Sequence, residues 1–276
     1  LVLFALLAPA HECPVERHLK NARMMVRLRS RFSLTIGVSV PFVRLIRGSI
    51  YRPIAPQGSR GVDENRVLMK MDAQQNVLKT GTSTIGITFD GGVVVGADHR
   101  ATMGHFIANK SVQKLFKIGE NLALTTAGLV GHAQSLSRTL SAEVALFQLR
   151  RQQPMTVRGA ATLTANILSG RPHWVQLLIV GVDDEGGHVY SIDSAGGSIP
   201  DVYCATGSGS PYMYGVLEDG FKEGMSRTDA LKLAARALHA SGQRDAASGN
   251  GMDLAVITAK EGYVAITQAE ISKLLS

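Results

Sequence analysis

The stretch LKTGTSTIGITFDGGVVVGAD, residues 78–98, decides the fold of this chain. Its segment TSTIGITF, which begins at Thr82, alternates along its length and is rich in β-branched residues, so it predicts a strand. The Asp-Gly-Gly triplet at 90–92 is typical of a hairpin turn. GVVVGAD then predicts a buried strand that ends near Asp98. The stretch therefore predicts two antiparallel strands that begin directly after the pair Gly81 and Thr82.

Downstream of this hairpin, the predicted elements come in blocks rather than in regular alternation. Strands are followed by two helices, then strands, two more helices and a closing pair of strands with a short helix. A regular βαβ alternation, which a parallel sheet would need, is absent from this order. The order favours an α+β fold with antiparallel sheets and helices segregated outside them. The predicted helices cover 130–151, 156–168, 210–221, 227–241 and 269–275, and the later strands lie within 114–128, 175–184, 188–193, 201–207, 252–259 and 262–267.

Upstream of the hairpin, the charge changes sharply. The chain has 276 residues and a net charge of +7, with 29 basic and 22 acidic residues. Residues 1–81 hold 13 basic and 5 acidic residues, a net charge of +8; residues 82–276 hold the other 16 basic and 17 acidic ones, a net charge of −1. The whole positive excess therefore lies before Thr82, and the basic character of the chain says nothing about the partners of the later part.

The Arg-rich segment before Thr82 admits three interpretations. Ten basic residues and no acidic residue occur between Arg17 and Arg60, which is typical of a transit peptide. The segment could also be a genuine long propeptide. Alternatively, residues 1–68 are upstream sequence translated from a misplaced start, with Met69 or Met71 as the natural start. Residues 1–81 are therefore expected to be a leader and residues 82–276 one catalytic domain. Under the last interpretation, the leader is only the short segment MDAQQNVLKTG that ends at Gly81.

Several classes of protein are excluded by the motifs that the chain lacks. Its two cysteines cannot make a disulfide framework, and no zinc-ligand spacing or HExxH motif occurs. There is no phosphate-binding GxxxxGK[ST] loop and no GxSxG nucleophile elbow. No apolar run reaches the roughly 18–20 residues that span a bilayer. We therefore expect no metal and no cofactor, and we expect a cytoplasmic protein.

The Gly-Thr junction resembles the self-cleaving site of an N-terminal nucleophile hydrolase. The resemblance extends through ADHRATMGHFIANKSVQKLFKI, TTAGLVGHAQ, SIDSAGGS, ATGSGSPYMYGVLE and QRDAASGNGMDLAVIT. In this order, these segments look like the proteasome β subunit, and most like its archaeal type. The resemblance covers nearly all of residues 82–276 and none of residues 1–68. It implies a four-layer αββα sandwich, in which two antiparallel sheets lie between layers of helices.

The chemistry of such a site depends on the new N-terminus. A threonine hydroxyl is a poor nucleophile near neutral pH and needs an adjacent base. If the chain begins at Thr82, its own α-amine is that base, because a free α-amine has a pKa of about 7.7–8.0. Before cleavage the same nitrogen is an amide, so the precursor is latent and Thr82 must first attack the Gly81 carbonyl. Glycine suits position 81 because it permits a strained turn and a close approach.

The resemblance implies further catalytic residues. Lys114 matches the lysine whose ammonium lies beside the nucleophile, favours the alkoxide and keeps the amine neutral. Asp98 matches the carboxylate that orients this lysine. Gly128 matches the glycine whose N–H forms the oxyanion hole. The group that hydrogen-bonds the threonine amine and hydroxyl corresponds to Ser208, Asp245 and Ser248.

A side-chain pocket for the substrate is implied as well. Its matching residues are small, apolar or uncharged, which predicts cleavage after hydrophobic residues. They are Ala101, Thr102, Val112, Thr126, Val130 and Gln134.

The resemblance also implies an assembly. We expect a threonine endopeptidase subunit that forms heptameric β rings, which α rings flank in a four-ring barrel. An AAA-type ATPase would feed unfolded polypeptide to it. The alternatives are a catalytically silent ring subunit and, because of the +7 charge, a nucleic-acid or membrane-binding protein. Silent subunits typically lose the Gly-Thr junction or the lysine, both of which this chain keeps, and no nucleic-acid-binding module supports the last alternative.

Overall fold

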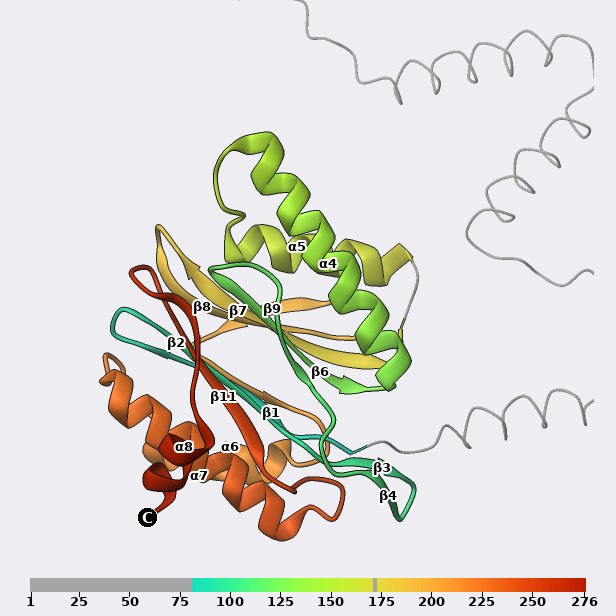
Figure 1. Cartoon of the computed structure of the whole chain (residues 1–276), viewed down its shortest axis with the longest axis vertical. Helices are drawn as coiled ribbons and strands as arrows, with labels where there is room; N and C mark the ends of the chain where they lie inside the picture. The colour runs from blue at the N-terminus through green and yellow to red at the C-terminus, as the bar shows by residue number, and fades with distance from the viewer. Residues whose placement is uncertain (1–80, 171–172) are drawn as a thin grey trace, which may run out of the picture. The chain divides into compact units, whose positions relative to one another are not determined.

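Two five-stranded antiparallel sheets lie at the centre of the protein (Figure 1). The computed structural model describes residues 81–170 and 173–276. The first sheet has the order β10-β1-β2-β11-β12, and the second has the order β5-β6-β7-β8-β9. The strands of the first sheet are β1 (Thr84–Phe89), β2 (Gly92–Asp98), β10 (Tyr203–Thr206), β11 (Met252–Thr258) and β12 (Gly262–Ala265). Those of the second are β5 (Leu115–Lys117), β6 (Leu122–Gly128), β7 (Val175–Asp183), β8 (Gly186–Ile192) and β9 (Ser198–Asp201).

Helices cover the outer face of each sheet. In Figure 1, α4 and α5 lie over the second sheet, and α6, α7 and α8 lie on the opposite side, against the first sheet. Their bounds are α4 (Val130–Arg151), α5 (Val157–Gly170), α6 (Ser210–Gly220), α7 (Arg227–Arg244) and α8 (Gln268–Leu275). The order helix, sheet, sheet, helix confirms the α+β sandwich that the sequence predicts.

Three apolar cores match the three interfaces of this sandwich. One lies between the first sheet and its helices, with Ile85, Ile87 and Leu238 among its members. Another lies between the second sheet and α4 and α5. The third lies between the sheets and contains Val95 and Val180. Alternation along β1 and β2 explains this division, because successive side chains of a strand point to opposite faces.

The sheets approach closely at Gly86 of β1. A Cβ at this position would lie 2.9 Å from a methyl group of Val180 and 3.1 Å from one of Val189, both on the second sheet. Three hydroxyl groups also join the sheets at this interface. Thr125 of β6 donates to Thr84 at 3.0 Å, and Thr84 shares a 2.6 Å hydrogen bond with Thr206. The residues just after Thr82 are therefore fixed against both sheets.

Three features of the strands differ from the sequence prediction. A separate two-stranded hairpin, β3 (Ala101–Met103) with β4 (Phe106–Asn109), follows β2 and was not predicted. The predicted strand at 201–207 is divided: β9 ends at Asp201 in the second sheet, and β10 begins at Tyr203 in the first. The chain thus changes sheets at Val202. The predicted bounds of α4 are confirmed, whereas β1 begins two residues after Thr82.

The predicted leader, residues 1–81, lies outside the described residues except for Gly81. The three interpretations of residues 1–68 therefore stay predictions. Among the described residues, no helix is long and apolar enough to cross a membrane.

Candidate active site

Thr82 lies buried at the entrance to β1, with its hydroxyl beside the preceding peptide bond. Thr82 is only 4% exposed, and its Oγ1 donates a 2.6 Å hydrogen bond to the Gly81 carbonyl oxygen. The Thr82 N–H donates to Ser208 Oγ at 3.1 Å. The Gly81 N–H donates to Thr102 Oγ1 at 3.0 Å. The hydroxyl is therefore held next to the carbonyl group that the sequence analysis expects it to attack.

On one side of Thr82, Asp98 and Lys114 form a buried ion pair. Lys114 Nζ donates to Asp98 Oδ1 at 2.6 Å, and the two side chains are 5% and 3% exposed, respectively. The same Asp98 oxygen accepts the Ser83 N–H at 2.9 Å, and Oδ2 accepts the N–H groups of Arg100 and Gly249. Lys114 Nζ also donates to the Arg100 carbonyl oxygen. Asp98 ends β2 and Lys114 precedes β5, so the pair also links the two sheets.

Burial governs the ionisation of Lys114. Desolvation lowers the pKa of its ammonium below the usual 10.5, and the nearby Asp98 carboxylate offsets part of this shift. A lysine with a lowered pKa in an enclosed pocket is a typical feature of functional sites. The same geometry also suits a fixed cation that stabilises negative charge nearby.

On the other side of Thr82, hydroxyl groups and a carboxylate form a connected chain. Ser208 Oγ and Ser248 Oγ both donate to Asp245 Oδ2, each at 2.6 Å. Ser208 precedes α6 and Asp245 caps the C-terminus of α7, so two residues 37 positions apart in the chain meet here. Only Ser208 bonds Thr82 directly. Ser248 instead shares a 2.7 Å hydrogen bond with Ser83.

Gly128 and the start of α4 form the far side of the site. Gly128 has a φ of 128°, which favours glycine, and a Cβ there would collide with the Trp174 carbonyl oxygen. The helix α4 begins two residues later, and its first turn holds no acidic side chain. The N-terminus of a helix carries partial positive charge and unpaired N–H groups, so it suits a developing oxyanion.

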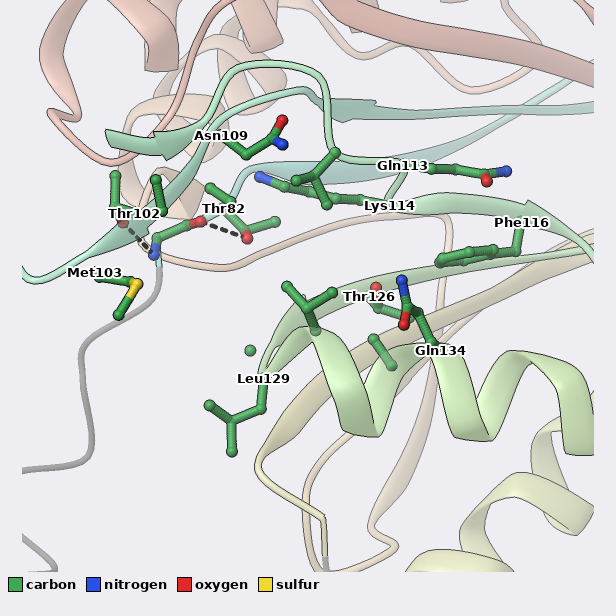
Figure 2. Close-up of a pocket in the computed structure, with 17 residues that line it drawn as sticks. Thr82, Thr102, Met103, Asn109, Gln113, Lys114, Phe116, Thr126, Leu129 and Gln134 are labelled. Atoms are coloured by element: carbon green, nitrogen blue, oxygen red, sulfur yellow. Dashed lines mark hydrogen bonds between the residues drawn. The ribbon is translucent and has the colours of Figure 1, made fainter. Parts of the chain in front are cut away.

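A pocket of about 370 Å³ brings together Thr82, Lys114, Gly128 and the start of α4, whereas Asp98, Ser208, Asp245 and Ser248 are not among its lining residues (Figure 2). In Figure 2, Lys114 points toward Thr82, while Leu129, Thr126 and Gln134 lie across the pocket from it. All six residues that the sequence assigns to the substrate pocket line it. They are Ala101, Thr102, Val112, Thr126, Val130 and Gln134. Gly81, Thr82, Lys114 and Gly128 line the same pocket, together with residues that were not predicted, such as Met103, Asn109 and Phe116.

Arg100 is the principal residue of the site that the sequence analysis missed. Its Nη1 donates to the Ala246 carbonyl at 2.8 Å and its Nε to Asn250 Oδ1 at 2.7 Å. It therefore ties the loop 245–250, which carries Asp245 and Ser248, to the end of β2. Its neighbours are about 150 residues away in the chain, so the sequence around Arg100 gave no signal of this role.

Comparison with known proteins gives a consistent result. The family model described as "Proteasome subunit" matches residues 78–257. The chain is 48% identical over 198 residues to the proteasome subunit beta of Picrophilus torridus, which covers 71% of this chain and 94% of that protein. It is 47% identical over 199 residues to the proteasome subunit beta of Methanohalophilus mahii, an alignment that covers 71% of this chain and 94% of that protein. It is 46% identical over 197 residues to the proteasome subunit beta of Thermoplasma acidophilum, an alignment that covers 70% of this chain and 93% of that protein.

Proposed function

The chain belongs to the proteasome subunit family, and from this premise we propose that it is a threonine-type endopeptidase that activates itself by cutting the bond between Gly81 and Thr82. The observation that carries the proposal is the 2.6 Å hydrogen bond from Thr82 Oγ1 to the Gly81 carbonyl oxygen, in a pocket that also holds Lys114. A nucleophile that is held beside its target carbonyl group needs little further ordering to reach the transition state.

Self-cleavage proceeds in two steps. Thr82 Oγ1 attacks the Gly81 carbonyl carbon, the C–N bond breaks, and the hydroxyl proton ends on the released Thr82 nitrogen. This step leaves an ester between Gly81 and Thr82 Oγ1. Water then hydrolyses the ester, which gives a Gly81 carboxylate and a free Thr82 with an α-amine and a hydroxyl group. The Gly128 region and the start of α4 would stabilise the oxyanion in each step.

The mature enzyme repeats this chemistry on a substrate. The Thr82 α-amine takes the Oγ1 proton as Oγ1 attacks the substrate carbonyl, and passes it to the leaving amine. Water hydrolyses the resulting acyl-enzyme. The Lys114 ammonium, held by Asp98, stabilises the alkoxide and disfavours protonation of the amine. Ser208, with Asp245 behind it, holds the amine in position.

The pocket favours substrates with hydrophobic side chains. Its side chains beyond Thr82 and Lys114 are uncharged, and they include Ala101, Val112 and Val130. We expect fluorogenic peptides with leucine or tyrosine before the cleaved bond to have a kcat/KM at least about tenfold above those with arginine or aspartate, because burying an unpaired charge is costly. Equal values for all four peptides would remove the proposed preference.

A family member of this kind works within an assembly. We propose that the chain forms rings with further β subunits, that α subunits stack on these rings, and that an ATP-driven unfoldase delivers unfolded polypeptide. The catalytically silent ring subunit is the second candidate. Retention of Thr82, Asp98 and Lys114 in one buried arrangement favours the active subunit.

The decisive experiment is the intact mass of the full chain after expression, compared with its Thr82→Ala variant. We expect the native chain to yield a fragment that begins at Thr82, and the variant to keep the Gly81–82 bond intact and to hydrolyse no peptide. Thr88→Ala, on the strand β1 that follows Thr82, is the matched control and should behave like the native protein. A Thr82→Ala protein that still cuts this bond would refute the proposal, and an intact native chain would favour the silent subunit.

A further inference from the structure

Gly81 lies in a narrow slot with a different residue on each side. On one side, the buried Thr102 hydroxyl of β3 accepts the Gly81 N–H at 3.0 Å. On the other, Ala247 from the loop after α7 lies against the Gly81 Cα, so that a Cβ at position 81 would collide with the Ala247 Cβ and lie 2.8 Å from its Cα. The slot therefore has room for a residue without a side chain.

These contacts give a steric reason for glycine at this position. The sequence analysis expected a close approach at Gly81, and the structure contains it. Distances this short between a Cβ and a neighbouring Cβ or backbone atom oblige one of the two segments to move.

The loop that carries Ala247 is anchored on both sides and cannot withdraw easily. The Ala247 N–H donates to Asp245 Oδ1 at 3.1 Å. Arg100 bonds the preceding residue, Ala246, and also Asn250 beyond it. A side chain at position 81 would consequently displace the Gly81 segment more readily than the loop. The displaced atoms would include the carbonyl group that Thr82 Oγ1 contacts.

We propose that Ala247 is the steric wall that restricts position 81 to glycine: a side chain at position 81 would be pushed off this wall and would move the Gly81 carbonyl away from Thr82 Oγ1. This inference rests on the proposed self-cleavage. Ala247 takes no part in the reaction; the side chain added at position 81 is what would alter the placement of the reacting carbonyl. A displacement of about 1 Å at a reacting centre can slow a reaction by about 100-fold.

A compensating pair of substitutions tests the proposal. The self-cleavage rate of the full chain is followed by intact mass in five proteins: native, Gly81→Ala, Ala247→Gly, Gly81→Ala with Ala247→Gly, and Gly81→Ala with Ala246→Gly. We expect Gly81→Ala to slow cleavage about 100-fold and Ala247→Gly alone to cleave within about threefold of the native rate. Ala247→Gly should restore the Gly81→Ala chain at least tenfold.

Ala246→Gly is the matched control. Ala246 is an exposed neighbour in the same loop, and its replacement by glycine adds similar backbone freedom, whereas the three atoms nearest to a Cβ at position 81 all belong to Ala247. It should restore nothing. Native-like cleavage in Gly81→Ala, or equal rescue by the two loop variants, would overturn the proposal.

A second variant keeps the inference testable if the Gly81→Ala proteins do not fold. Ala247→Val enlarges the wall of the slot while position 81 stays glycine, and it should slow self-cleavage at least tenfold; a native rate contradicts the proposal. The Thr82→Ala result distinguishes failure of the slot inference from failure of the proposed function. If Thr82→Ala blocks cleavage and the slot variants have no effect, the slot inference fails alone. If Thr82→Ala cleaves, the proposed function fails as well.

Discussion

The two groups of polar residues beside Thr82 differ in burial and in charge. Asp98 and Lys114 form an ion pair whose side chains are almost completely buried, and the carboxylate accepts four hydrogen bonds. The group of Ser208, Asp245 and Ser248 carries one negative charge, and its Ser208 is exposed. The ion pair is thus complete in the intact chain, whereas Ser208 lies at the Thr82 nitrogen, which would gain hydrogens if the Gly81–Thr82 bond were cut as proposed. We infer that cleavage changes the second group and leaves the first in place.

The largest effect should come from the ion pair. Lys114→Met keeps the length of the side chain and removes its charge, and we expect kcat of the mature enzyme to fall about 1000-fold, at the upper end of what one stabilising donor contributes. The uncompensated buried Asp98 should also lower the free energy of unfolding by about 3–5 kcal/mol. Peptidase assays and thermal melting at fixed protein concentration measure the two effects.

Lys117→Met is the control for this variant. Lys117 forms an exposed pair with Glu120 at 2.8 Å, with side chains 41% and 79% exposed, and exposed pairs contribute about 0–1 kcal/mol. If Lys114→Met kept turnover within tenfold of the native value, the charged side of the site would have no special role.

A smaller effect should come from the group formed by Ser208, Asp245 and Ser248. Ser208→Ala removes the partner of the Thr82 nitrogen, and we expect kcat to fall about 10-fold to 100-fold, below the range for a full general acid or base. Stability should change by less than about 1 kcal/mol, because Ser208 is exposed and solvent can replace its hydrogen bonds. Ser210→Ala, two residues further on, serves as the control. A larger loss for Ser208→Ala than for Lys114→Met would reverse the comparison.

The smallest effect on activity should come from the hydroxyl groups between the sheets. Thr125→Val keeps the shape of the side chain and removes the donor to Thr84. We expect a loss of about 1–2 kcal/mol in stability, typical of one buried hydrogen bond, and kcat within about twofold of the native value. Denaturation at fixed protein concentration and peptidase assays test this. A tenfold loss of kcat would mean that the hydroxyl groups between the sheets position Thr82 as strongly as the two groups of polar residues beside it.

The sequence predicts best the elements whose burial follows a regular pattern. The strand at 92–98 is buried at every position, and the helix Val130–Arg151 buries Leu136, Leu140 and Val144 at helical spacing. The hairpin of β3 and β4 and the strand β9 were missed because most of their residues are exposed, so no alternation marks them. Pro200 in β9 weakened the signal further.

The resemblance identified the site residues that lie within family motifs. It did not identify residues whose role depends on contacts between distant segments. Asp98, Lys114 and Ser208 lie in segments that match the family, and the structure brings them around Thr82. The contacts of Arg100 and of Ala247 join residues more than 140 positions apart. A single sequence contains no local pattern for such a meeting, because it depends on how the loop after α7 returns to the end of β2.

The position of β1 inside its sheet determines when the segment after Thr82 becomes ordered. A newly made chain terminus is usually the most mobile part of a protein. Here the strand that follows Thr82 pairs with β10 on one edge and β2 on the other, with Thr84 opposite Thr206 and Ala97. The conformational entropy of this strand is therefore lost while the protein folds, before the proposed cleavage could occur. If the Gly81–Thr82 bond is cut as proposed, the new terminus begins only two residues before a strand that is paired on both edges.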